Sequence, residues 1–209
     1  MRYQLSLLAF LLAFLASPGL AQNKMMFELS AMHFNLSESR AATAGDGSTY
    51  TRKTKTAHTY YGLGFCYVTS IWCFGAKYLA AERKSDYSAS NTQTKLRGTL
   101  EMSGYGLTIG YQGGAALAHF TYLIEAEKRL GDTDALDFGG STSTKYPAKL
   151  AYSLDLGYGF DFRGLRIGPL LRITHFEYDK IIVGSQTYSL ERTEADDFII
   201  PHFALWVDF

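Results

Sequence analysis

Charged residues occupy alternate positions in segments otherwise rich in glycine, serine and threonine, and they are the first candidates for chemistry. Alternate residues of a β-strand share one face, so we predict that these charges line the inside of a closed sheet. Two interpretations follow: a core of ion pairs that neutralises the interior, or a path or gate for ions. A barrel of eight strands is filled by its own side chains, which favours the ion-pair core. The predicted members of this network are Glu28, Lys77, Glu125, Lys149, Asp155, Arg166 and Arg172, with Asp155 diagonal to Arg172 on adjacent strands.

The two cysteines, Cys66 and Cys73, are equally far from a predicted turn at Thr69-Ser70. In that register they lie directly opposite each other on one face, and opposite residues have Cα atoms about 4.5–5.5 Å apart. This separation permits a disulfide, which an oxidising compartment would favour. A metal site is not predicted, because no third ligand is placed nearby.

The five histidines are scattered over different predicted strands and share no ligand spacing, so we predict neither a metal nor a cofactor. His175 and Glu177 continue the apolar face of their strand. A hydrolytic site there would need a serine beside the histidine as nucleophile. The local sequence, Thr174-His175-Phe176-Glu177, has none, so we interpret the pair as polar residues at an interface and predict no catalytic residue. The five histidines are His33, His58, His119, His175 and His202.

The elements that must position these residues are strands, because apolar and polar residues alternate with a period of two. The composition agrees: 15 tyrosines, 14 phenylalanines and 20 glycines are typical of strands and turns. The eight predicted strands are Met25–Phe34, His58–Val68, Ile71–Ala81, Gly104–Tyr111, Ala116–Glu125, Lys149–Phe160, Leu165–Ile173 and Phe203–Phe209.

Tight turns alternate with long polar segments between these strands. The turns are predicted at Thr69-Ser70, Gly113-Gly114 and Phe162-Arg163, and each keeps the apolar face continuous across its hairpin. In these registers Tyr67 pairs with Trp72, Tyr111 with Ala116 and Phe160 with Leu165. The four predicted long loops are Ser37–Thr56, Arg83–Leu96, Arg129–Pro147 and Tyr178–Asp197.

The N-terminal segment has the pattern of a secretory signal. Arg2 precedes an apolar run from Leu5 to Ala16 and a small-residue ending at Ala21. We therefore predict a signal peptide over residues 1–21 and one barrel domain over residues 22–209. No later apolar run is long enough for a transmembrane helix. The 20 basic and 20 acidic residues give no reason to expect a nucleic-acid partner.

The two strand faces differ in kind: one carries large apolar and aromatic residues, the other glycine, small polar residues and the charges. A soluble barrel would need the bulky face inside, where eight strands enclose too little volume. We therefore place the apolar face against lipid, with rows of aromatic residues at both edges. Pro169 and Pro201 conflict with a closed barrel, which has no edge strand, and we expect a local bulge there.

The closing strand carries alternate apolar residues and stops on an aromatic one. Phe203, Leu205, Val207 and Phe209 share one face, and this ending resembles the C-terminal signature of bacterial outer-membrane barrels. The whole pattern resembles small barrels such as the OmpX group and the transmembrane domain of OmpA. We predict an all-β fold: an eight-stranded antiparallel transmembrane β-barrel with short periplasmic turns and four long extracellular loops.

The resemblance implies a location in the outer membrane of a Gram-negative bacterium. Outer-membrane lipid, lipopolysaccharide and the barrel-assembly machinery would be partners, the last reading the C-terminal strand. The expected function is non-enzymatic: surface interaction with an extracellular ligand, or envelope integrity. Two alternatives stay open, a lipid A-modifying enzyme of the PagP or PagL type and a narrow channel for small solutes.

Overall fold

The computed structural model describes residues 23–43, 45, 47–90, 95–131, 144–163 and 165–209. The predicted signal peptide lies outside these residues. Within them, no helix has the length and apolarity needed to cross a membrane. The strands are β1 (Lys24–Thr43), β2 (Thr49–Thr69), β3 (Trp72–Ala89), β4 (Lys95–Gly113), β5 (Ala116–Leu130), β6 (Thr144–Tyr158), β7 (Phe160–Phe162), β8 (Leu165–Val183) and β9 (Gln186–Asp208).

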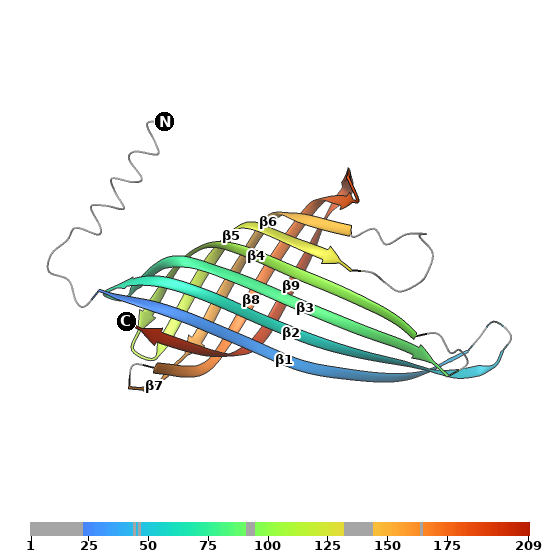
Figure 1. Ribbon diagram of the computed structural model, residues 1–209, viewed down its shortest axis with the longest axis horizontal. Coiled ribbons are helices and arrows are strands. Elements are labelled where there is room, and N and C mark those ends of the chain that lie inside the picture. Colours follow the sequence, from blue (N-terminus) through green and yellow to red (C-terminus); the bar gives the residue numbers. More distant parts are fainter. Residues whose placement is uncertain (1–22, 44, 46, 91–94, 132–143, 164) are drawn as a thin grey trace.

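The strands form one antiparallel sheet that closes on itself. Consecutive strands pair from β1 through β6. β6 then pairs with β8, β8 with β9, and β9 with β1, which completes the ring. The short β7 continues from β6 and extends the same edge of β8. Eight strands therefore make the ring, as predicted, and Figure 1 shows them crossing the barrel at a steep tilt.

Burial alternates with the predicted period in the parts of the strands that form the closed ring. In β5, Leu117, His119 and Thr121 are buried, whereas the intervening Phe120 and Tyr122 are exposed. The glycine-rich, charged face therefore lies inside and the large apolar residues cover the outside, as the sequence predicts. Two apolar clusters fill the interior. One contains Met26, Cys66, Val68, Cys73, Leu117, Leu170, Ala204 and Trp206, and the other contains Leu79, Met102, Leu123, Ala126, Ala151, Phe176 and Tyr178.

The strands continue far into segments that the sequence predicts as loops. β1 and β2 pair without interruption up to Thr43 and Thr49, inside the predicted loop Ser37–Thr56. The predicted loop Tyr178–Asp197 is likewise a hairpin of β8 and β9 that turns between Val183 and Gln186. Three of the four long-loop predictions are therefore wrong, including Arg83–Leu96, most of which pairs in β3 and β4. In these outer parts of the strands the side chains of both faces are exposed, so the sequence shows no alternation of apolar and polar residues. Backbone hydrogen bonds nevertheless continue the ladder. The fourth loop lies partly outside the described residues.

All three tight hairpins turn one residue later than predicted. The ladder closes at Thr69↔Trp72, Gly113↔Ala116 and Phe162↔Leu165. The first residue of each turn has a positive φ: 57° at Ser70, 57° at Gly114 and 58° at Arg163. Such backbone angles match the right-handed twist of the flanking strands. The resulting register differs by two residues from the predicted one, so every side chain keeps its face.

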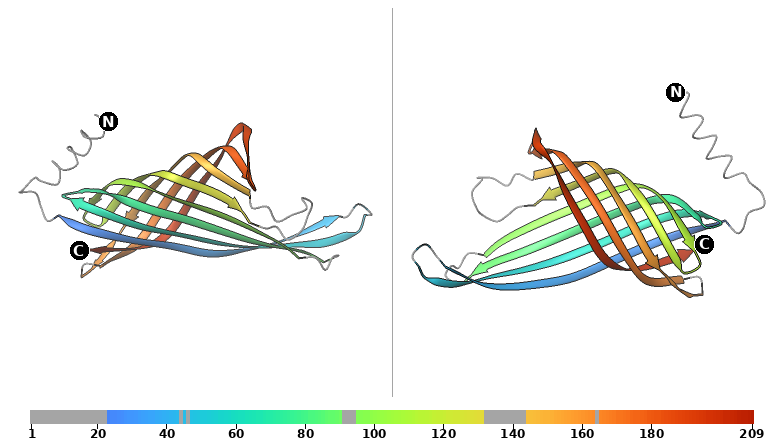
Figure 2. Two further views of the ribbon diagram at one scale, coloured as in Figure 1. Left: turned by 45° about the horizontal axis from the view of Figure 1, so that its top comes forward. Right: turned by 180° about the vertical axis from the view of Figure 1, so that it is seen from behind.

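The seam between β1 and β9 is much shorter than the other ladders of the ring. It contains six residue pairs, from Met26↔Asp208 to Ala31↔Phe203, whereas β1 pairs with β2 over its full length. Beyond Ala31 and Phe203 the two strands diverge, and β1 to β3 run out to one side while the β8–β9 hairpin runs to another (Figures 1 and 2). The described sheet is thus closed near its termini and open at its far end.

The two prolines lie where the ladders stop. Phe209 and Met25 exchange both backbone hydrogen bonds, so alternate residues back from Phe209, including Pro201, direct their backbone nitrogen toward β1. Pro201 is two residues beyond the last seam pair, where no donor is needed. Pro169 lies between the last β7 pair, at Ile167, and the first β6 pair, at Leu170. The expected bulge is absent from this part of the β8–β9 ladder, because interrupted pairing accommodates both prolines.

Candidate functional site

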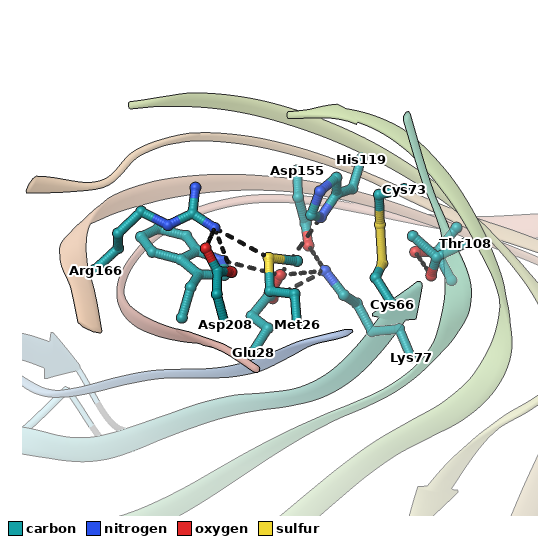
Figure 3. Close-up of a disulfide and its surroundings, with 12 residues drawn as sticks. Met26, Glu28, Cys66, Cys73, Lys77, Thr108, His119, Asp155, Arg166 and Asp208 are labelled. Atoms are coloured by element: carbon teal, nitrogen blue, oxygen red, sulfur yellow. Dashed lines mark hydrogen bonds and ion pairs between the residues drawn. A yellow bond between two sulfur atoms is a disulfide. The ribbon is translucent and has the colours of Figure 1, made fainter. Parts of the chain in front are cut away.

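Four charged side chains from four strands meet in the closed part of the barrel. Glu28 comes from β1, Lys77 from β3, Asp155 from β6 and Arg172 from β8, and all are buried. The Lys77 ammonium lies 2.6 Å from the Asp155 carboxylate and 2.9 Å from that of Glu28. Figure 3 shows the Lys77 side chain between these two carboxylates. The pairs therefore connect strands that are not neighbours in the ring.

Arg172 completes the cluster on its β8 side. Its Nε donates to Asp155 Oδ1 at 2.8 Å and its Nη2 donates to Asp155 Oδ2 at 2.9 Å. Nη2 also lies 3.1 Å from Ser30 Oγ and 3.3 Å from Glu28 Oε1. Two cations thus balance two carboxylates, with hydrogen bonds that offset the desolvation of buried charge.

This arrangement joins strands rather than presenting a reactive group. The apolar cluster around Trp206 lies on one side of the charges, and the cluster around Phe176 continues on the other. Trp206 Nε1 itself donates to Glu28 Oε2 at 3.3 Å. His119 is fully buried beside the same carboxylate, with Nδ1 at 3.5 Å from Oε2. The charges are therefore surrounded by packed side chains, as in an ion-pair core.

Arg166 belongs to a second, separate cluster near the chain termini. Its Nη2 lies 2.7 and 3.0 Å from the two carboxylate oxygens of Asp208, and Figure 3 shows the pair apart from Lys77 and Asp155. Lys24 also contacts Asp208, at 2.5 Å. Lys24 and Asp208 were not among the predicted members. Pairing of the first strand with the last brings them together, and no local pattern carries that information.

Glu125 and Lys149 do not lie inside the barrel, and their predicted placement is wrong. A bulge in the β4–β5 ladder leaves Ile124 without a partner, so Glu125 faces outward and accepts a hydrogen bond from Tyr105 at 2.7 Å. The β6–β8 ladder shifts register on both sides of Ala148. Lys149 is exposed there, with its ammonium 3.6 Å from Glu177.

The same bulge brings Lys128 inside, a residue that the sequence analysis missed. Its Nζ lies 2.7 Å from Asp196 Oδ2 and is 4.5 and 4.7 Å from the ring centroids of Tyr178 and Tyr146. These contacts combine an ion pair with cation–π attraction. An uninterrupted period of two would place Lys128 outside, so only the bulge reveals its position.

The predicted disulfide between Cys66 and Cys73 is confirmed. The Cα atoms are 5.5 Å apart, and the bond lies inside the barrel (Figure 3). The two residues are diagonal rather than directly opposite, because Cys66 pairs with Gly75 and Cys73 with Val68. The disulfide therefore links adjacent strands within the apolar cluster around Trp206.

The histidines occupy separate environments, and no group of three or more potential metal ligands occurs among the described residues. His175 is on the outer face, where its Nδ1 lies 2.8 Å from Asp197 Oδ1 and its ring stacks on Tyr152 with centroids 4.9 Å apart. A histidine–carboxylate pair orients an imidazole for proton transfer. Among the described residues, no serine or threonine hydroxyl hydrogen-bonds to His175 as a nucleophile would.

A small cavity lies beside the charge cluster, on the side away from the chain termini. Its volume is about 30 Å³, enough for water or a group of a few atoms. Its walls are mostly apolar and aromatic, with a few hydrogen-bonding side chains. The lining residues are Tyr60, Tyr61, Leu79, Ala80, Ala81, Met102, Arg172, Thr174, Phe176, Phe198, Ile200 and His202.

The open end of the sheet offers a different kind of site. From Met32 to Thr43, β1 pairs with β2 on one side and with no described strand on the other. Unpaired N–H and C=O groups on a strand edge can pair with another extended chain. Most side chains from Asn35 to Thr43 are exposed, so the edge is accessible from both faces.

The chain has little detectable similarity to known proteins. No family model matches the chain, and no curated protein matches it. Among solved structures, the outer membrane protease OmpT from Escherichia coli is similar over 93% of this chain and 99% of that chain, with 8% identity and a TM-score of 0.45. Similarity of this size assigns no activity to the chain.

Proposed function

We propose that the protein is a non-enzymatic outer-membrane β-barrel whose extracellular sheet binds other proteins through the free edge of β1. Three features support this proposal: an apolar outer belt, a lumen filled by ion pairs and two apolar clusters, and a strand edge that projects beyond the closed ring. The free edge at Met32–Thr43 carries the functional part of the proposal.

The belt supports a membrane location. Large apolar side chains that soluble proteins bury are exposed all around the ring, including Leu107 at 62% and Phe203 at 72%. Aromatic residues gather in rows, as in the pairs Trp72↔Tyr111 and Tyr78↔Tyr105. Lipid-facing apolar bands with aromatic edges are typical of outer-membrane barrels. In this orientation the tight turns face the periplasm and the open sheet faces outside.

The proposed location brings further partners with it. Outer-membrane lipid and lipopolysaccharide would contact the belt, and the barrel-assembly machinery would recognise the apolar face of the last strand. That face consists of Phe203, Leu205, Val207 and Phe209, of which Phe203 and Phe209 are strongly exposed. Leu205 and Val207 pair with Leu29 and Phe27 at the seam, so the machinery could pair with this edge of the last strand only before the ring closes.

The experiment removes edge donors without breaking the β1–β2 ladder. Met25 bonds to Phe209 and the β1–β2 register has no shift, so Ser37 and Ser39 also direct their N–H groups away from β2. Ser37→Pro/Ser39→Pro therefore blocks strand addition, and Ser37→Ala/Ser39→Ala is the matched control. The assay is adhesion of bacteria displaying each variant to an epithelial cell layer.

We expect wild type and the alanine control to adhere equally, and the proline variant to lose at least about tenfold, as loss of two backbone hydrogen bonds implies. Equal adhesion by the proline variant would refute the edge as the binding element. Adhesion no greater than that of bacteria lacking the protein would refute the binding function. Cell fractionation and protease treatment of intact cells test the location.

The pairing of His175 with Asp197 favours a second candidate, a lipid A-modifying hydrolase. Mass spectrometry of lipid A from cells with and without the protein tests it, since an unchanged acyl pattern removes this candidate. A narrow channel is the third. Here planar-bilayer recordings decide, and single-channel currents would support conduction despite the ion-pair core.

A further inference from the structure

The cavity beside the charge cluster has mostly apolar walls, and its few polar side chains are hydrogen-bond donors. Its charged and polar lining residues are Arg172, His202, Thr174 and the two tyrosines, and none of its lining residues is acidic. A guanidinium, an imidazole N–H and hydroxyl groups all donate. The carboxylates that balance Arg172 are outside this lining, so an anion would meet donors there in a low-dielectric space.

One polar side chain at this cavity, that of His202, is buried without a hydrogen-bond partner among the described residues. His202 is 3% exposed, and neither of its ring nitrogens has a hydrogen-bond partner among the described residues. Arg172 uses Nε and Nη2 on Asp155, Glu28 and Ser30. A Cβ atom at position 62 would lie 2.5 Å from Arg172 Nη1. Glycine at this position therefore leaves room for the guanidinium. Buried polar groups are rarely left unpaired, which indicates that this space holds a ligand or water.

We propose that this cavity binds a small monoanion, a carboxylate group held by Arg172, His202 and Thr174. The volume of about 30 Å³ suits a group of this size. Phe176, Phe198 and Ile200 enclose it on the apolar side, which strengthens electrostatic attraction by excluding water.

The position of the cavity allows two sources for the carboxylate. Tyr60 pairs with Met32, the first β1 residue beyond the seam, and His202 is the first β9 residue beyond it. Their rings meet edge to face, with centroids 6.2 Å apart. The site therefore lies directly behind the opening between β1 and β9. A free carboxylate can enter from the open end, and a fatty acid can insert its head while its chain lies in the opening between β1 and β9. The second source rests on the proposed membrane location.

The test titrates the folded protein in maltoside micelles with sodium acetate, sodium decanoate and, as the uncharged control, decanol. Nitrogen-15 resonances of the His202 ring report binding and are assigned with His202→Phe. Thr174→Val removes one donor at nearly constant volume and should weaken binding about tenfold. Thr108→Val is the matched control, because Thr108 is also a buried β-strand threonine but bonds to Thr121 at 2.9 Å, away from the cavity.

Saturable shifts with acetate, with an affinity about tenfold weaker in Thr174→Val but unchanged in Thr108→Val, support a site for a free anion. Shifts with decanoate alone support the head group of an amphiphile. No shift with either anion, or equal shifts with decanol and decanoate, would overturn the proposal. Heat-modifiable gel migration establishes that each variant is folded. Adhesion by a folded His202→Phe variant separates this site from the strand edge, because the two can fail independently.

Discussion

Asp155 and Arg172 face each other directly across β6 and β8, and two hydrogen bonds of 2.8 and 2.9 Å join the carboxylate to the guanidinium. Lys77 reaches the same carboxylate from β3. A single carboxylate therefore holds two cations from distant strands, which makes Asp155 the centre of the interior.

Asp155→Asn should destabilise the protein by about 3–5 kcal/mol, because it leaves Lys77 and Arg172 buried with one carboxylate between them. The measurement is urea unfolding in phosphatidylcholine vesicles, followed by tryptophan fluorescence. Asp86→Asn is the control: its pair with Arg97 is largely exposed, so its loss should change stability by less than about 1 kcal/mol. Similar effects of the two substitutions would contradict the central role of Asp155.

Removing the Cys66–Cys73 bond should lower stability by about 2–3 kcal/mol, because the cysteines are only seven residues apart in sequence and short loops gain least from cross-linking. Urea unfolding with and without a reductant measures the difference. The Cys66→Ala/Cys73→Ala variant should show no response to reductant. A barrel that fails to fold when reduced would show that the disulfide is required rather than supportive.

Gly106→Ala should cost about 1–3 kcal/mol or prevent folding, because the new Cβ would lie 1.9 Å from the carbonyl oxygen of Tyr122. Gly106 is adjacent to the bulge that turns Glu125 outward, so the backbone has little room to move. Gly45→Ala is the matched substitution, since nothing lies within 4 Å of its Cβ position. Folding yield, scored by heat-modifiable gel migration, should fall for Gly106→Ala alone.

The seam predicts a sharp change in amide exchange along β1. Phe27 and Leu29 lie within the six-pair ladder to β9, whereas His33 and Asn35 lie beyond it. All four direct their N–H toward β9 by the alternation of the ladder. Hydrogen exchange measured by NMR in micelles should be slow at the first two and fast at the last two. Equal protection at all four would mean that the seam closes in solution.

Strand number and inward-facing residues follow from the sequence because each depends on local alternation. Glu28, Lys77 and Asp155 lie inside as their parity requires. Parity fails at Glu125 and Lys149, because a bulge is one unpaired residue in a ladder and leaves no mark on composition. The cavity and seam depend on where β1 and β9 separate. That is a relationship between the two ends of the chain, which no local pattern encodes.

The short seam also has a kinetic consequence. It joins segments that are far apart in sequence: Lys24 and Asp208, which form an ion pair, are separated by 184 residues. The hairpins, by contrast, pair strands that are neighbours in sequence. Closing so long a loop carries the largest entropic penalty of any pairing in the fold, and six pairs return little to offset it. Ring closure should therefore be the last step of folding and reopening the first step of unfolding. Pairing of β1 with β9 would therefore control whether the ring is open or closed.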